Sequence, residues 1–208
     1  SMFQQSAPSD LTNWTLPRAS SGINLTFNHM FTSGLTGQVD LSKWNVETVT
    51  SMHKMFYGAY NFNSDLSNWD TSAVRDMHKM FYGHNKAMRF AGSVANWDLS
   101  SVTDVDSMFQ QSAPSDLTNW TLPSSTSSLF QGSLFNADIS FWSARSVTNM
   151  DSMFKSAANF NQDVSAWDVS RVADMSSMFK HAKSFGGNLS SWDTSRVSTF
   201  KNMFDGAT

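Results

Sequence analysis

An internal repeat of about 25 residues, present in about eight copies, constrains the fold of this chain more than any other feature. A unit this short cannot bury its own apolar side chains, whereas stacked copies join them into continuous columns. We therefore predict a single solenoid domain over residues 1–208. Because the chain begins inside a copy, at Ser1, we expect it to be a fragment of a longer surface protein. The repeat is marked by Trp14, Trp44, Trp69, Trp97, Trp120, Trp142, Trp167 and Trp192.

Two hydrophobic periods follow each other within each copy. The first, L-x-x-W-x-V, ends with apolar residues two positions apart, as at Trp167 and Val169, which is typical of a short strand. The second, V-x-x-M-x-x-M-F-x-x-A, runs from Val172 to Ala182 in steps of three and four, which is typical of helical turns. The pattern predicts an α/β repeat solenoid similar to leucine-rich repeats, with short parallel strands on one face and short helical turns on the other.

Three copies depart from the period. Residues are inserted between Trp14 and Met30 and around residues 85–88, and the segment after Trp120 is shortened. The segment SMFQQSAPSDLTNWTLP occurs unchanged at 1–17 and 107–123, which indicates a recent duplication. Insertions in repeat proteins usually form loops on one face, so these copies are either neutral drift or part of a binding surface.

The motifs W-D-x-S-x-V and M-x-x-M-F resemble the repeat of BspA-like surface proteins and Mycoplasma-type lipoproteins, a family distantly related to leucine-rich repeats. The resemblance covers essentially the whole chain. It implies a cell-surface or extracellular location, a role in adhesion or ligand recognition, and no enzymatic activity. It assigns no functional residues.

Composition and motifs exclude several classes of function. The net charge is −3 and the Lys and Arg residues are scattered, so nucleic-acid binding is not expected. No run of 18 apolar residues is present, so we expect no membrane insertion within the chain. Cys is absent, which excludes disulfides and thiolate metal sites. Hydrolase, phosphate-binding and dinucleotide motifs are also absent, and we predict that the protein is not an enzyme.

The Trp column could stack sugars, but its register with aliphatic columns favours core packing, with each indole N–H bonded to a neighbouring turn carbonyl. The Met columns are interpreted as core in the same way. An Asn column follows the Phe that closes three copies: Asn63, Asn136 and Asn161.

Acidic residues form two further columns. Stacked carboxylates repel unless they accept backbone N–H bonds in turns, face Lys or Arg, or bind Ca²⁺. Turn capping is favoured and no other cofactor is expected. One column directly follows Trp: Asp70, Asp98, Asp168 and Asp193, with Asn45 in the same position. The other precedes Trp by four residues: Asp10, Asp40, Asp65, Asp116, Asp138 and Asp163.

Two of the five His residues share a column. His53 and His78 lie in the repeated MHKMFYG and are expected to stack on each other, beside Lys54 and Lys79, on the solvent face of a helix. A metal site is conceivable there, but no third ligand recurs.

The polar positions beside Trp are the best binding candidates, since the residues between core positions are expected to point outward. We predict a non-catalytic recognition or adhesion module that binds a protein or glycan there; this polar surface is a poor match for anionic partners. The alternatives are a structural spacer and a calcium-dependent glycan binder. The predicted ligand-binding residues are Asn68, Asp70, Asn96, Asp98, Phe141, Asp168 and Asp193.

Overall fold

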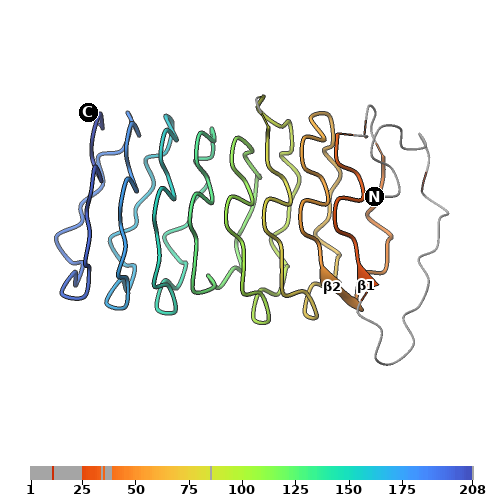
Figure 1. Ribbon diagram of the computed structural model, residues 1–208, viewed down its shortest axis with the longest axis horizontal. Helices are drawn as coiled ribbons and strands as arrows, with labels where there is room; N and C mark the ends of the chain where they lie inside the picture. The colour runs from red at the N-terminus through yellow and green to blue at the C-terminus, as the bar shows by residue number, and fades with distance from the viewer. Residues whose placement is uncertain (1–10, 12–24, 34, 36–38, 85, 208) are drawn as a thin grey trace.

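The chain winds into a row of coils that lie side by side, as Figure 1 shows. The computed structural model describes residues 11, 25–33, 35, 39–84 and 86–207. Each coil corresponds to one copy of the repeat, and backbone hydrogen bonds join it to the next. The amide of Phe154, for example, donates to the carbonyl of Met178 at 2.9 Å, and the amide of Phe179 donates to that of Met203 at 2.9 Å.

Regular secondary structure is scarce. Strand β1, Leu25–Thr26, pairs in parallel with β2, Val49–Ser51, and the two form one small sheet. Single parallel bridges link later coils, such as Asp174 to Thr199. The described part of the chain contains no helix, and none of it could cross a membrane as a long apolar helix. The predicted α/β solenoid with helical turns is therefore wrong.

The segment that was predicted to be helical pairs instead with the neighbouring coil. The amides of Met52, Lys54, Phe56 and Gly58 each donate to a carbonyl of the next coil at 2.8–2.9 Å. The amides between them close turns within their own coil, as Met55 does on the carbonyl of Met52 at 3.0 Å. Each of these turns brings residue i close to residue i+3. A succession of them therefore places apolar residues three positions apart, the same spacing that a short helix gives.

A left-handed residue before each described Met-Phe pair, and before Leu129-Phe130, prevents a helix from forming. These residues have φ between 53° and 57°, the conformation that a type II turn requires at its third position. An α-helix needs negative φ throughout, so it cannot pass through this position. The column comprises His29, Lys54, Lys79, Ser107, Ser128, Ser152, Ser177 and Asn202.

The segment L-x-x-W-x-V, predicted to be a strand, consists of turns. The amide of Trp69 donates to the carbonyl of Leu66 at 3.0 Å, and the amide of Val74 donates to that of Thr71 at 2.9 Å. Strand β2 and most of the parallel bridges between coils lie instead just before the first Met of each copy, next to the segment whose alternate amides pair with the next coil. The sequence pattern thus assigned strand and non-strand to the wrong halves of the repeat.

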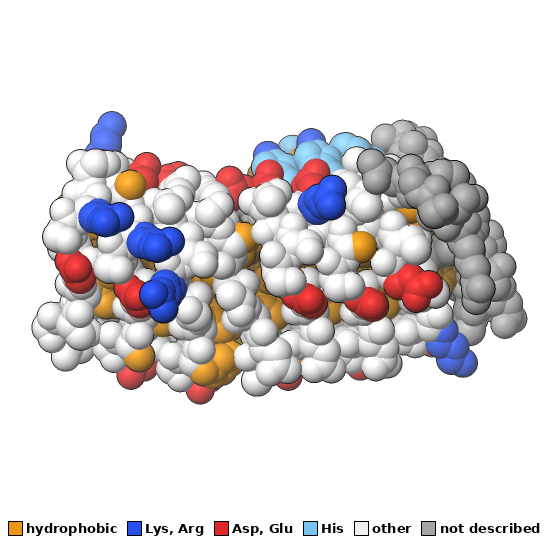
Figure 2. Space-filling model, turned by 90° about the horizontal axis from the view of Figure 1, so that it is seen from below, with side chains coloured by type: hydrophobic (Ala, Val, Ile, Leu, Met, Phe, Trp, Pro, Cys, Tyr) orange, Lys and Arg blue, Asp and Glu red, His pale blue; other side chains and the backbone are white. Residues whose placement is uncertain are grey.

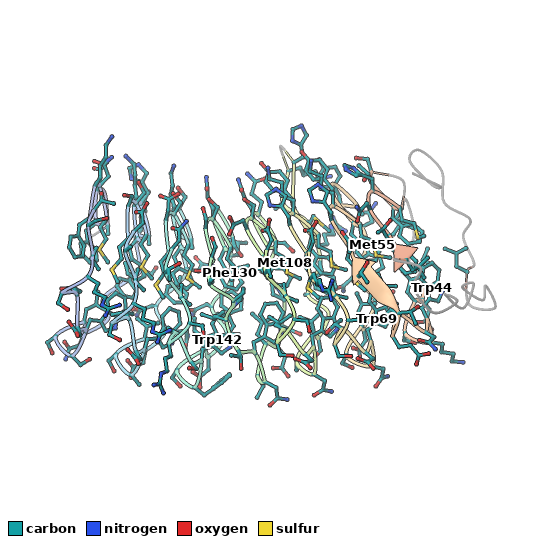
Figure 3. The ribbon with its side chains drawn as sticks, turned by 60° about the horizontal axis from the view of Figure 1, so that its bottom comes forward. Trp44, Met55, Trp69, Met108, Phe130 and Trp142 are labelled. Carbon is teal, nitrogen blue, oxygen red and sulfur yellow. The ribbon has the colours of Figure 1, made fainter. Side chains whose placement is uncertain are left out.

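The core consists of stacked columns of identical side chains. The Phe of each Met-Phe pair stacks on its counterpart in the next coil, with ring centroids 5.3–5.8 Å apart from Phe31 to Phe204. The closing Phe packs against this column, as Phe160 does on Phe154 at 3.8 Å. Figure 3 shows labelled Trp, Met and Phe side chains distributed along the stack.

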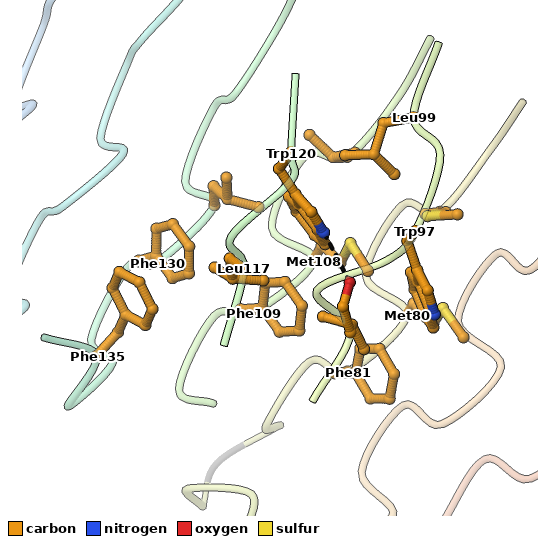
Figure 4. Packing of buried hydrophobic residues seen from close by; sticks show 14 of the residues in the cluster. Met80, Phe81, Trp97, Leu99, Met108, Phe109, Leu117, Trp120, Phe130 and Phe135 are labelled. Atoms are coloured by element: carbon orange, nitrogen blue, oxygen red, sulfur yellow. Dashed lines mark hydrogen bonds between the residues drawn. The ribbon is translucent and has the colours of Figure 1, made fainter. Parts of the chain in front are cut away.

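The Trp column is part of this core, as predicted. Trp69 and Trp97 are 2 % and 1 % exposed, and their rings stack at 6.1 Å. Each described indole N–H donates to a backbone carbonyl of the preceding coil; Figure 4 shows this bond for Trp120, which reaches the carbonyl of Val94 at 2.9 Å. The prediction of a neighbouring turn carbonyl as its partner is confirmed. Trp14 lies outside the described residues.

The irregular copies keep the core columns filled. The insertion near Lys86 buries Met88, whose amide donates to the carbonyl of Gln111 at 2.9 Å. In the short copy after Trp120, the buried Thr126 takes the place of the first Met and Leu129 takes that of the second. The insertion between Trp14 and Met30 lies largely outside the described residues.

Candidate functional site

The residues directly before and directly after each described Trp, from Trp44 to Trp192, form what we call the Trp-flanking surface. Because the indole turns into the core, its two neighbours in the chain face solvent. Phe141 is 48 % exposed, an unusual position for a large apolar side chain. Asn119 donates from Nδ2 to Oδ1 of Asn96 in the preceding coil at 3.3 Å, so neighbouring coils touch along this surface. All seven predicted residues are exposed: Asn68, Asp70, Asn96, Asp98, Phe141, Asp168 and Asp193.

The carboxylates that follow Trp close turns. Asp98 accepts a hydrogen bond from the amide of Ser100 at 2.8 Å, and Asp168 accepts one from the amide of Ser170 at 3.1 Å. Hydrogen bonds from the hydroxyl and the amide of Ser170 hold the pKa of Asp168 below its usual value. Asn45 closes the equivalent turn without a charge, since its Oδ1 accepts from the amide of Glu47 at 3.0 Å. Turn capping is therefore confirmed for this column.

The second acidic column does the same. Asp65 accepts from the amide of Ser67 at 2.9 Å, and Asp163 accepts from that of Ser165 at 2.9 Å. The hydroxyl and the amide of Ser165 lower the pKa of Asp163. Asp10 lies outside the described residues. Both acidic columns thus carry side chains whose position is fixed by the backbone two residues ahead.

No group of three or more His, Cys, Asp or Glu side chains in the described residues could hold a metal ion. Calcium takes six to eight oxygen ligands, so a site needs several carboxylates or carbonyls that converge. Within the described coils the Asp columns supply turn caps, and the arrangement offers no support for a calcium site.

Sequence reasoning missed a third column of turn-capping side chains, directly before the first Met of each copy. Asp76 accepts from the amide of His78 at 2.9 Å, and Asp174 accepts from that of Ser176 at 2.8 Å. The sequence does indicate this column, because Ser, Thr, Asn or Asp, the residue types that cap turns, occupies the position in copy after copy. These residues lie where the coils pair, so they mark the true ladder of the stack.

The His residues also differ in part from expectation. His53 and His78 stack with ring centroids 5.1 Å apart, which confirms their contact between neighbouring coils. Their expected place on a helix is wrong, and their side chains are only 27 % and 25 % exposed. Asp76 Oδ2 lies 3.6 Å from His53 Nδ1. Burial lowers the pKa of His53 although the charge of Asp76 opposes this.

The Asn column after the closing Phe is a ladder between coils. Oδ1 of Asn136 accepts from the amide of Asn161 at 2.9 Å, and Oδ1 of Asn161 accepts from the amide of Gly186 at 2.9 Å. Asn63 makes the same bond to the amide of Ala91 at 2.7 Å. These side chains hold the stack together, so they are structural residues.

Fold and surface together define a repeat protein in which the buried columns join the coils and the exposed columns are available for contact. A family model described as Mycoplasma protein of unknown function, DUF285, matches residues 1–120 and 113–208, and the chain belongs to this family. The Mycoplasma-type part of the resemblance is thereby confirmed. No curated protein and no solved structure matches the chain.

Proposed function

We propose that this chain is a non-catalytic recognition or adhesion module of a cell-surface or extracellular protein, and that its Trp-flanking surface binds a protein or glycan. The observation that carries the proposal is the exposure of all seven predicted residues beside a buried Trp column. The kinship with BspA-like surface proteins is part of this proposal and rests on the motifs W-D-x-S-x-V and M-x-x-M-F.

Three features of this surface support binding. The turn bonds hold Asp98 and Asp168 in place, so a ligand need not order them and loses less entropy on binding. The exposed ring of Phe141 adds an apolar contact to an otherwise polar surface. Repetition along the stack offers the same groups at regular intervals, and extended repeat surfaces are commonly used for binding.

A triple variant tests the proposal without disturbing the turns. Asp98→Asn and Asp168→Asn remove charge but keep a turn-capping oxygen, as Asn45 shows. Phe141→Ser introduces the residue type found at the equivalent position two coils later, where Ser191 precedes Trp192. We expect the wild-type protein to bind members of a glycan array or a panel of extracellular-matrix proteins. The triple variant should lose that binding while it stays folded, with only a small fall in melting temperature from the two lost charges.

The same experiment separates the alternatives. Binding that survives the triple variant, or no binding at all, contradicts the proposal, and the second outcome favours a structural spacer. If chelator abolishes binding or lowers the melting temperature, the calcium-dependent glycan binder is favoured instead.

A further inference from the structure

A second surface is built from the two identical MHKMFYG segments and the insertion that follows them. We call it the basic aromatic face. Tyr57 and Tyr82 stack with their rings 5.0 Å apart and 1° from parallel. His84 Nδ1 lies 2.7 Å from the hydroxyl of Tyr57, so the insertion is tied to the same column. Figure 2 shows the His side chains gathered with Lys or Arg at the upper edge of the molecule. The face comprises His53, Lys54, Tyr57, His78, Lys79, Tyr82, His84 and Lys86.

The Lys residues of this face lie against its Tyr rings. The ammonium of Lys54 is 5.9 Å from the ring centroid of Tyr57, and that of Lys79 is 5.6 Å from Tyr82. In the described part of the chain, no carboxylate forms an ion pair with Lys54, Lys79 or Lys86. The carboxylates of Asp76 and Asp104 face the His rings instead, and Asp106 replaces His78 in the next coil, where the face ends.

Like charges in neighbouring coils repel each other at this spacing. Lys54 and Lys79 occupy one column, and His53 and His78 occupy the next. The charges of Lys54 and His78 both act to lower the pKa of His53, in addition to the effect of burial. Asp76 and Asp104 offset this repulsion at the His rings, and an anion bound across the two coils would offset it at Lys54 and Lys79, which form no ion pair in the described chain.

The geometry selects among anionic partners. Single-stranded nucleic acid binds by stacking its bases on free aromatic faces, but these Tyr and His rings are stacked on one another. An extended acidic peptide presents side chains on one side about every 6.6–6.8 Å, wider than the 5.0–5.1 Å between the stacked rings. An acidic glycan offers anionic groups without the fixed spacing of an extended peptide and without bases that need free aromatic faces.

We propose that the basic aromatic face binds an acidic glycan, with Lys54 and Lys79 paired to sulfate or carboxylate groups on successive sugars. Lys86, whose ammonium lies 5.4 Å from the ring of Tyr60, extends the cationic surface toward the insertion. Charge-assisted hydrogen bonds to the anionic groups supply most of the affinity. The face shares no residue with the Trp-flanking surface, so this proposal stands independently of the function proposed above.

The probe is a heparin-derived octasaccharide, titrated into the whole chain by calorimetry at near-physiological salt. The test variant is Lys54→Ser with Lys79→Ser, because Ser107, Ser128, Ser152 and Ser177 hold the same column in other coils with the same left-handed φ. We expect at least about tenfold weaker binding, the effect of losing one charge-assisted hydrogen bond.

A charge-matched control carries Lys155→Gln and Lys201→Ser. Gln110 and Gln131 occupy the column of Lys155, and Ser127 and Ser176 occupy that of Lys201. This control should bind within about twofold of the wild type, since exposed charges beyond a Debye length of about 8–10 Å are screened. The triple variant of the Trp-flanking surface should also bind unchanged.

A readout without substitution completes the test. The imidazole NMR signals of His53 and His78 should shift when the octasaccharide is added to the wild-type protein, and those of His181 should not. The proposal is overturned if the octasaccharide does not bind, if test and control variants lose affinity equally, or if the signals of His53 and His78 do not move. Tighter binding of oligothymidylate or polyglutamate of equal charge would also overturn it.

Discussion

The indole nitrogen of Trp167 donates a hydrogen bond to the carbonyl oxygen of Ile139 in the preceding coil, across 3.1 Å. The same oxygen accepts from the amide of Trp142 at 3.1 Å, which closes a turn within its own coil. One carbonyl thus joins a turn to the next coil. The relationship recurs for every indole from Trp69 to Trp192, and the indole of Trp44 donates to the carbonyl of Leu11, so Trp serves both packing and pairing.

Replacing Trp167 should therefore reveal two separable contributions to stability. We expect Trp167→Ala to lower the free energy of unfolding by about 3–5 kcal/mol, because it leaves a cavity in the core. Trp167→Phe keeps an aromatic ring but loses the indole bond, so its cost should be smaller. Urea unfolding measures both. The exposed Phe141→Ala is the control and should change stability by no more than about 0.5 kcal/mol; a similarly small effect of Trp167→Ala would contradict the buried column.

The left-handed position at Ser177 predicts an unusual order of substitutions. Its φ is 55°, which a β-branched side chain adopts only with strain and Gly adopts freely. We expect Ser177→Val to destabilise the protein by about 1–3 kcal/mol and Ser177→Gly to cost much less. If the segment were helical, Val would be the better residue of the two. Thermal unfolding of the pair therefore distinguishes the turn from the predicted helix.

The columns of the repeat could be predicted from sequence because burial depends on which side chains recur. Trp69, Met77 and Phe81 recur in register with apolar residues of other copies, and all three are buried. Local conformation could not be predicted in the same way. A spacing of three between Met77 and Met80 fits a helical turn and an i→i+3 turn equally well, and only the hydrogen bonds separate them.

The sign of φ was the missing information. Lys54 and Ser177 give no hint of a left-handed residue, because neither type favours it. A better signal lay two residues after the Phe, where Gly58 has φ of 67° and Gly132 has φ of 65°. Gly recurring at that position indicates turns. The turn caps of the candidate site were predictable from the chemistry of Asp alone. The ligand depends on how side chains from several coils are combined, so no single residue type predicts it.

Acid should destabilise the protein through its turn caps. Hydrogen bonds in the folded state lower the pKa of Asp168 and Asp193 below 3.8, so the unfolded chain binds more protons just below that pH. Stability is then present above pH 3.8 and is lost as the pH falls through the folded pKa values. NMR titration of these carboxyls, with urea midpoints against pH, measures the effect; folded pKa values above 3.8 for both would contradict it.

Asp106 should behave in the opposite sense. Burial raises the pKa of Asp106, although its Oδ1 accepts hydrogen bonds from the hydroxyl of Ser125 at 2.7 Å and from the amide of Ser127 at 3.0 Å. The folded state therefore binds more protons than the unfolded chain just above pH 3.8, and this contribution favours folding as the pH falls. We expect Asp106→Asn, which keeps an accepting oxygen, to raise the urea midpoint at neutral pH and to lose that gain in acid. Asp168→Asn is the matched control and should show no such gain.

The end of the stack predicts how the protein responds to shortening. The ring of Phe179 stacks on Phe204 at 5.8 Å, and the indole of Trp192 donates to the carbonyl of Val164 at 3.0 Å, so the last coil contacts only its neighbours. Removing residues 187–208 should leave a folded protein with a lower urea midpoint, and an m value reduced in proportion to the lost surface. Trp142→Ala, in the middle of the stack, disturbs coils on both sides and should reduce the midpoint without reducing m. Loss of all cooperative unfolding on shortening would mean that the coils depend on contacts more distant than their neighbours.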